Sequence, residues 1–83
     1  MAHIKQNLKE RMVYAILHAV ARGFSVIVPI RSANDDYTVN VNPDGSVTLT
    51  GRSHAVNQYN GSRLKDLPFM LVARIFDNVP EPI

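Results

Sequence analysis

The chain has 83 residues, no cysteine and a formal net charge of +2 at pH 7. This length fits a single domain, residues 1–83, and the lack of cysteine excludes disulfide cross-links, thiol nucleophiles and cysteine-based zinc sites. Hydrophobic residues make up 46% of the chain and charged residues 19%, a balance typical of a folded globular domain rather than a disordered one.

The first expected element is a helix over residues 4–22, because its apolar residues recur at helical spacing. One broad face of this helix carries Met12, Val13, Ile16, Leu17, Ala19 and Val20. The opposite face carries Asn7, Arg11, Tyr14, His18 and Arg22. Gly23 is placed to end the helix in a left-handed cap.

The residues from Phe24 to Arg31 change to a period of two, which predicts a strand. Phe24, Val26, Val28 and Ile30 fall on one face of that strand. Pro29 cannot donate a ladder hydrogen bond, so we expect this strand at a sheet edge or with a bulge.

A second hairpin is specified by the segment Asn42-Pro43-Asp44-Gly45. Proline suits a type I turn, and glycine suits the position after it where φ is positive. Folding there pairs Val41 with Val47 and Val39 with Leu49 on one face, and Asn40 with Thr48 and Thr38 with Thr50 on the other. Apolar residues then meet apolar ones and polar residues meet polar ones.

The remaining chain predicts a polar loop at 52–63 and an apolar helix over 67–76. The pair Asn60-Gly61 could instead turn a short extra hairpin within the loop. A buried strand is the alternative for 67–76, because short apolar runs are ambiguous by pattern alone. Residues 79–83 predict an extended tail.

The predicted fold class is therefore α+β, in the order αβββα, with a three-stranded antiparallel sheet and the helices packed on one face. This order resembles the topology of double-stranded-RNA-binding domains. No lysine-rich, glycine-bounded signature opens the last helix, so the resemblance is limited to topology.

No motif in the chain predicts catalysis, and we expect neither an enzyme, a cofactor nor a metal site. His3, His18 and His54 are not at ligand spacing from one another. The pair Asp35-Asp36 and Asp44 would lie at opposite ends of one strand, ~17 Å apart at ~3.4 Å per residue. The chain also has no Gly-x-Ser-x-Gly elbow and no glycine-rich phosphate loop.

The basic residues predict one candidate binding surface for nucleic acid or for an acidic partner. Residues 1–23 carry four basic and one acidic residue, and residues 52–65 carry three basic residues and no acidic one. Arginine, histidine and tyrosine side chains are common in phosphate contacts and base stacking. The candidate residues are Arg11, Tyr14, His18, Arg22, Arg52, His54, Tyr59, Arg63 and Lys65.

The apolar helix predicts a second candidate surface, because its apolar residues surround it almost completely. One sheet and one other helix would leave part of it uncovered, unless the 52–63 loop and the tail fold over it. We expect a protein interface, which a homodimer could supply, at Phe69, Met70, Ala73 and Arg74. The strand edge at Ser46–Thr50 has no residue that would block pairing with another chain.

These features favour a small, non-enzymatic cytoplasmic protein that binds and modulates a larger host protein or protein–nucleic acid complex. An accessory protein of a phage or mobile element that inhibits host defence or transcription would have this profile. The alternative is a nucleic-acid-binding module that uses the first helix and the 52–65 region. The charged N-terminal segment lacks the apolar run of a signal peptide, and the longest apolar stretch is too short to span a membrane, so no membrane partner is expected.

Overall fold

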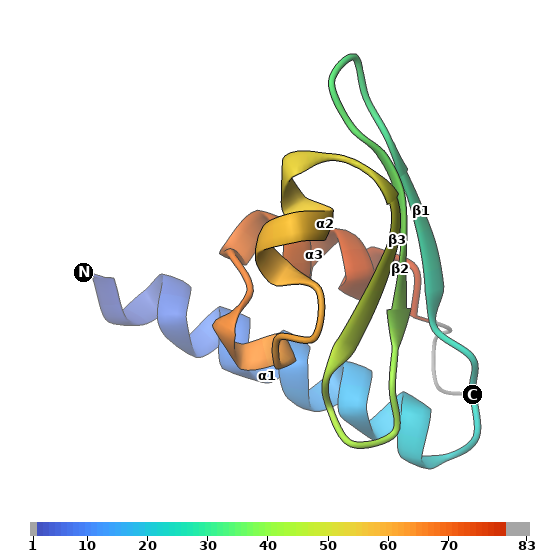
Figure 1. Cartoon of the computed structure of the whole chain (residues 1–83). Helices are drawn as coiled ribbons and strands as arrows, with labels where there is room; N and C mark the ends of the chain where they lie inside the picture. The colour runs from blue at the N-terminus through green and yellow to red at the C-terminus, as the bar shows by residue number, and fades with distance from the viewer. Residues whose placement is uncertain (1, 80–83) are drawn as a thin grey trace.

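A computed structural model describes residues 2–79 of the chain, with side chains from Asn7 onward. The elements are α1 (Ala2–Ala21), β1 (Ile27–Arg31), β2 (Asp36–Val41), β3 (Val47–Arg52), α2 (His54–Tyr59), the 3-10 helix η1 (Leu64–Asp66) and α3 (Phe69–Asp77). The three strands form one antiparallel sheet, and the helices lie on one side of it (Figure 1). The predicted α+β class and strand arrangement are confirmed. The predicted tail, beyond Val79, lies outside the described residues.

The β2–β3 hairpin has the predicted register. Val41 pairs with Val47, and Val39 pairs with Leu49. The Gly45 N–H donates a 3.0 Å hydrogen bond to the Asn42 carbonyl, and Gly45 has φ +91°. The turn chemistry and the alternating apolar pattern therefore select the same pairing.

The first strand begins later than predicted, at Ile27, and Phe24 is 44% exposed rather than inward-facing. The reason is that the Phe24 N–H donates to the Ala19 carbonyl at 3.1 Å, so its backbone completes the end of α1. The Val41 N–H donates to the Val26 carbonyl. The backbone N–H and C=O groups of Val26 and of every second residue after it therefore face β2. The backbone nitrogen of Pro29, which carries no hydrogen, therefore faces the outer edge of the sheet. This agrees with the edge position predicted from the sequence.

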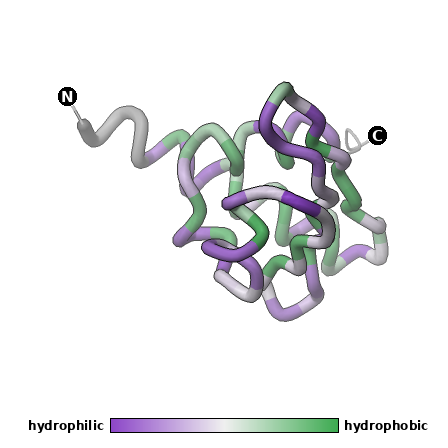
Figure 2. The backbone as a smooth tube through the Cα atoms, turned by 45° about the horizontal axis from the view of Figure 1, so that its top comes forward, coloured by the Kyte–Doolittle hydropathy of each residue, from purple (hydrophilic) through white to green (hydrophobic). Residues whose placement is uncertain are grey.

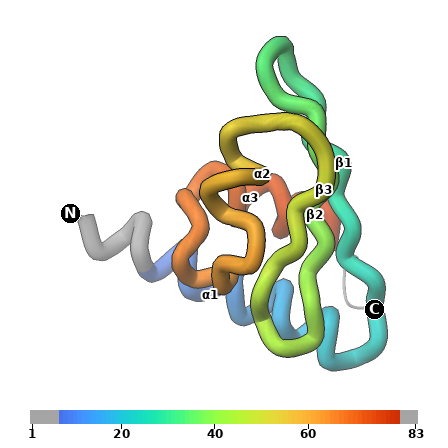
Figure 3. The backbone as a smooth tube through the Cα atoms, in the orientation of Figure 1, coloured from blue at the N-terminus to red at the C-terminus, as the bar shows by residue number. Residues whose placement is uncertain are grey.

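One face of the sheet is buried and the other is exposed. The buried face packs against Met12 and Ile16 of α1 and against Leu71, Val72 and Ile75 of α3. Figure 3 shows the backbones of α1 and α3 on this side of the sheet. Its strand residues are Val28, Ile30, Tyr37, Val39, Val41, Val47 and Leu49. Hydrophilic residues, purple in Figure 2, are prominent in the loop after β1 and in the β2–β3 turn.

The segment predicted as a polar loop at 52–63 contains α2 instead, and Asn60-Gly61 does not form an extra hairpin. The Ser53 hydroxyl accepts a 3.2 Å hydrogen bond from the Val56 N–H and caps the helix. Ala55, Val56 and Tyr59 then pack against the core. Tertiary packing thus stabilises a helix too short to form alone.

Residues 60–63 cover the outer edge of β3, so the prediction of an unprotected edge was wrong. The Val47 N–H donates to the Ser62 carbonyl at 2.9 Å, and the Val47 carbonyl accepts from the Gly61 N–H at 2.9 Å. The Leu49 N–H donates to the Asn60 side-chain oxygen at 3.0 Å. These bonds occupy groups that another strand would need for pairing.

The apolar segment 67–76 is mainly helical, which confirms the helix and excludes the alternative strand. Leu71, Val72 and Ile75 are buried, while Met70 is 76% exposed and Phe76 39% exposed. Leu67 precedes the helix and is itself fully buried. The helix therefore buries one face in the ordinary way, and the uncovered apolar surface is smaller than predicted.

Two glycines allow a rigorous test of the hairpin. A Cβ at Gly51, which has φ +138°, would lie 2.5 Å from the Asp36 carbonyl oxygen. A Cβ at Gly45 would meet the flexible end of Leu17 at 3.3 Å. Both alanine variants should destabilise the protein by about 1 kcal/mol or more through positive φ. Gly51→Ala should cost more, because backbone cannot move aside. Equal urea midpoints for the two variants would contradict this packing.

Candidate functional site

The outer face of α1, together with the residue that directly follows the helix, holds four of the predicted binding residues in one exposed stripe. Met12, Ile16 and Ala19 are buried on the opposite side and fix the rotation of the helix. The stripe consists of Arg11, Tyr14, His18 and Arg22. It extends for about 16 Å at ~1.5 Å per residue, and Tyr14 is 76% exposed.

The cations of this stripe are available to an external anion. In the part of the chain that the structure describes, the one ion pair joins Arg31 Nε and Asp36 Oδ1 at 4.0 Å, on the sheet. The Arg22 guanidinium lies 5.9 Å from the centre of the Phe24 ring, a distance that allows a weak cation–π contact. Charge on α1 is thus little compensated, apart from Glu10 on the same helix.

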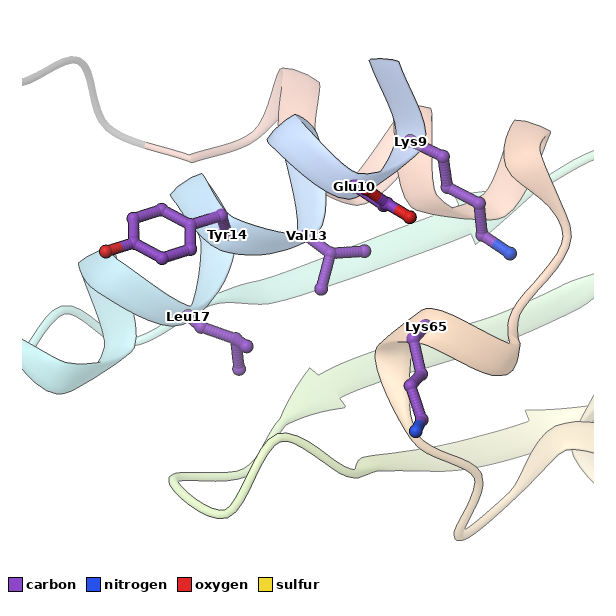
Figure 4. Close-up of a pocket in the computed structure, with 6 residues that line it drawn as sticks. All are labelled: Lys9, Glu10, Val13, Tyr14, Leu17 and Lys65. Atoms are coloured by element: carbon purple, nitrogen blue, oxygen red, sulfur yellow. The ribbon is translucent and has the colours of Figure 1, made fainter. Parts of the chain in front are cut away.

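A groove of about 440 Å³ lies beside the stripe, between α1 and η1. Val13 and Leu17 point from α1 into this groove, and Lys65 stands on the η1 side (Figure 4). Lys9, Glu10 and Tyr14 complete the lining. The groove therefore combines apolar α1 side chains with two lysines and one carboxylate.

A second, more open hollow of about 450 Å³ adjoins the groove. Its lining residues are Asn7, Glu10, Arg11 and Tyr14. Glu10 and Tyr14 line both hollows, so the two hollows adjoin at these side chains. Lys9, Glu10, Val13 and Leu17 were not predicted as site residues, because the groove depends on η1 approaching α1 from a distant part of the sequence.

Arg63 has a structural role rather than a free one. Its Nη1 donates a 2.9 Å hydrogen bond to the Asp44 carbonyl, which ties the chain before η1 to the β2–β3 turn. The Asp44 carboxylate accepts hydrogen bonds from the Ser46 hydroxyl at 2.6 Å and the Ser46 N–H at 3.0 Å. These bonds, with a smaller effect from the Arg63 charge, lower the pKa of Asp44.

The other predicted basic residues lie apart from α1. Arg52 is opposite Asp36 at the end of β3, on the face of the sheet that α1 does not cover. The β2–β3 turn, at the opposite end of β3, is ~17 Å from Arg52 at ~3.4 Å per residue. His54 begins α2 and is exposed, whereas Tyr59 is half-buried against the core. The structure therefore places five of the predicted binding residues along α1 and its groove: Arg11, Tyr14, His18, Arg22 and Lys65. The other predicted binding residues lie on separate parts of the surface or in the core.

The predicted protein interface on α3 is also divided by burial. Met70 and Arg74 are exposed, while Phe69 and Ala73 are half-buried against the core. Arg74 faces a hollow of about 530 Å³ beside β1, which Arg31 and Asp77 also line. Only part of this set is therefore open to a partner.

Among the described side chains, from Asn7 to Val79, no three His, Cys, Asp or Glu residues gather closely enough to hold a metal ion. No helix in that range is both long and apolar enough to cross a membrane. Comparison with family models, curated proteins and solved structures found no match to this chain.

The lowered pKa of Asp44 predicts a pH dependence of folding stability. A carboxyl group whose pKa is lower in the folded chain stabilises the fold above its unfolded pKa, and that contribution is lost as the pH falls through the folded value. Asp44→Asn keeps an acceptor oxygen but does not titrate. The stability difference between wild type and Asp44→Asn should therefore shrink on acidification below about pH 4. Urea unfolding at several pH values measures it, and a constant difference would contradict the role of Asp44.

Proposed function

We propose that this chain is a non-enzymatic nucleic-acid-binding domain that uses the outer face of α1. The observation that carries the proposal is the exposed stripe of Arg11, Tyr14, His18 and Arg22, whose two arginines have no ion-pair partner among the described residues. Arginine and histidine bind phosphate oxygens, and tyrosine provides a stacking surface for bases. Lys65 extends the positive charge across the groove.

Burial supports this function over docking through α3. Much of the apolar segment that favoured a protein partner is packed in the core, while α1 keeps its polar face exposed. The order of α1, the three strands and a C-terminal helix resembles the topology of double-stranded-RNA-binding domains, although α2 and η1 are inserted before α3, and this analogy points in the same direction. A cytoplasmic location, which we propose as well, would supply such a ligand.

Removing the charge at both ends of the stripe should weaken binding and its dependence on salt. The probe is a fluorescein-labelled DNA or RNA strand of about 20 nucleotides, and its duplex, measured by fluorescence anisotropy. Each phosphate contact contributes about −0.7 to the log–log salt slope for single strands and about −0.9 for B-DNA. The double variant Arg11→Gln and Arg22→Gln should therefore reduce the magnitude of the slope by about 1–2.

The matched control is the double variant Arg31→Gln and Arg52→Gln, which removes the same charge from the uncovered face of the sheet. Its affinity and salt slope should remain close to those of wild type. Absence of wild-type binding to every probe at low salt would refute the proposal. Equal losses in the two double variants would show that binding follows net charge rather than α1.

A second candidate function, docking on a larger protein with a modulating or inhibitory effect, is favoured by the exposure of Met70 at 76%. Self-association would use the same surface. Met70→Glu should leave the fold intact and weaken association measured by sedimentation, whereas Ile75→Ala should cost about 2–5 kcal/mol of stability because Ile75 is fully buried. A monomeric wild type at high concentration would exclude the homodimer.

A further inference from the structure

The position of Tyr14 on α1 bears on whether single-stranded or duplex nucleic acid would bind there. It lines both the groove beside η1 and the hollow beside Asn7 and Arg11. Its side chain is 76% exposed, so much of its surface is open to solvent. In Figure 4 it projects from the outer edge of α1, with its hydroxyl directed away from Lys65. A ring that lines two hollows can contact a flat group in each of them.

We propose that Tyr14 stacks between two unpaired bases of a single-stranded nucleic acid, one base in each hollow. This inference rests on the proposed function and adds a preference for single strands. Base–aromatic stacking requires bases that are not already stacked in a duplex. A duplex lying along α1 would present phosphates to the stripe and leave both hollows without a base.

The apolar side of the groove favours a base over a phosphate. Val13 and Leu17 supply apolar surface beside Tyr14, and a base has an apolar face that such a surface can cover. A phosphate has none and would lose hydration there without compensation. Both hollows are open, which suits a strand that passes along the helix.

The charges around the hollows support the same arrangement. Glu10 lines both, and its carboxylate repels phosphate but accepts hydrogen bonds from the amino group of a base. Lys9 and Lys65 line the groove, and Arg11 lines the second hollow. These cations are placed to bind the phosphates on either side of the stacked bases, while Glu10 directs base edges inward.

The test compares three probes of equal length: an ordinary single strand, an abasic strand with the same sugar–phosphate backbone, and a blunt duplex. Wild type should bind the ordinary strand about 5- to 100-fold more tightly than the abasic strand, the range expected for stacking of one base or more. Tyr14→Ser should bring this ratio close to one. Tyr14→Phe keeps the ring and should retain the preference.

Lys65→Gln is the matched control, because it removes a phosphate contact and should weaken binding to the ordinary and abasic strands by the same factor. Circular dichroism establishes that each variant is folded. Equal wild-type affinity for ordinary and abasic strands, or tighter binding to the duplex, overturns the inference and leaves the proposed function standing. Failure to bind any of the three probes refutes the proposed function itself.

Discussion

Seven inward-facing side chains on the three strands need apolar cover, and the alternation of each strand places all of them on the same side of the sheet. Burial of each such side chain contributes about 1.5–3 kcal/mol of transfer free energy, whereas the polar face gains nothing from being covered. Every helix is therefore drawn to one side. An 83-residue chain has little core beyond this layer, so its stability depends on it.

This one-sided core also determines which surface α1 offers to solvent. Met12 and Ile16 must face the sheet, and the helical period then sends Arg11, Tyr14 and His18 outward. The same packing brings η1 beside α1, because its first residue, Leu64, and Leu67 directly after it are both buried. The two buried leucines hold η1 where it forms one side of the groove. Lys65 lies between them in the sequence and lines the groove on that side.

The sequence predicted the parts of the fold that local chemistry determines. The Asn42–Gly45 turn and the alternation around it were sufficient for the hairpin register, and the spacing of apolar residues was sufficient for α1 and for the stripe on its outer face. Proline at position 29 correctly indicated an edge strand. These features depend on residues close together in the chain.

The features that were missed depend on residues far apart in the chain. The protection of β3 comes from the pairing of Val47 with Gly61 and Ser62, and α2 depends on a short cap plus packing against the core. The sequence predicted Arg63 as a binding residue, whereas its guanidinium donates a hydrogen bond to the Asp44 carbonyl. The approach of Lys65 to Lys9 and Tyr14 is likewise a consequence of tertiary structure, which pattern and composition do not encode locally.

The most direct test of this account is a map of backbone amide chemical shifts in the ¹⁵N-labelled protein during titration with a single-stranded oligonucleotide at low salt. Binding at the outer face of α1 predicts that shifts concentrate between Arg11 and Arg22 and at Lys65. The uncovered face of the sheet, at Thr38, Thr48 and Thr50, should remain unchanged. Shifts centred on that face or around Met70, or no shifts at all, would contradict the claim that the outer face of α1 is the binding surface.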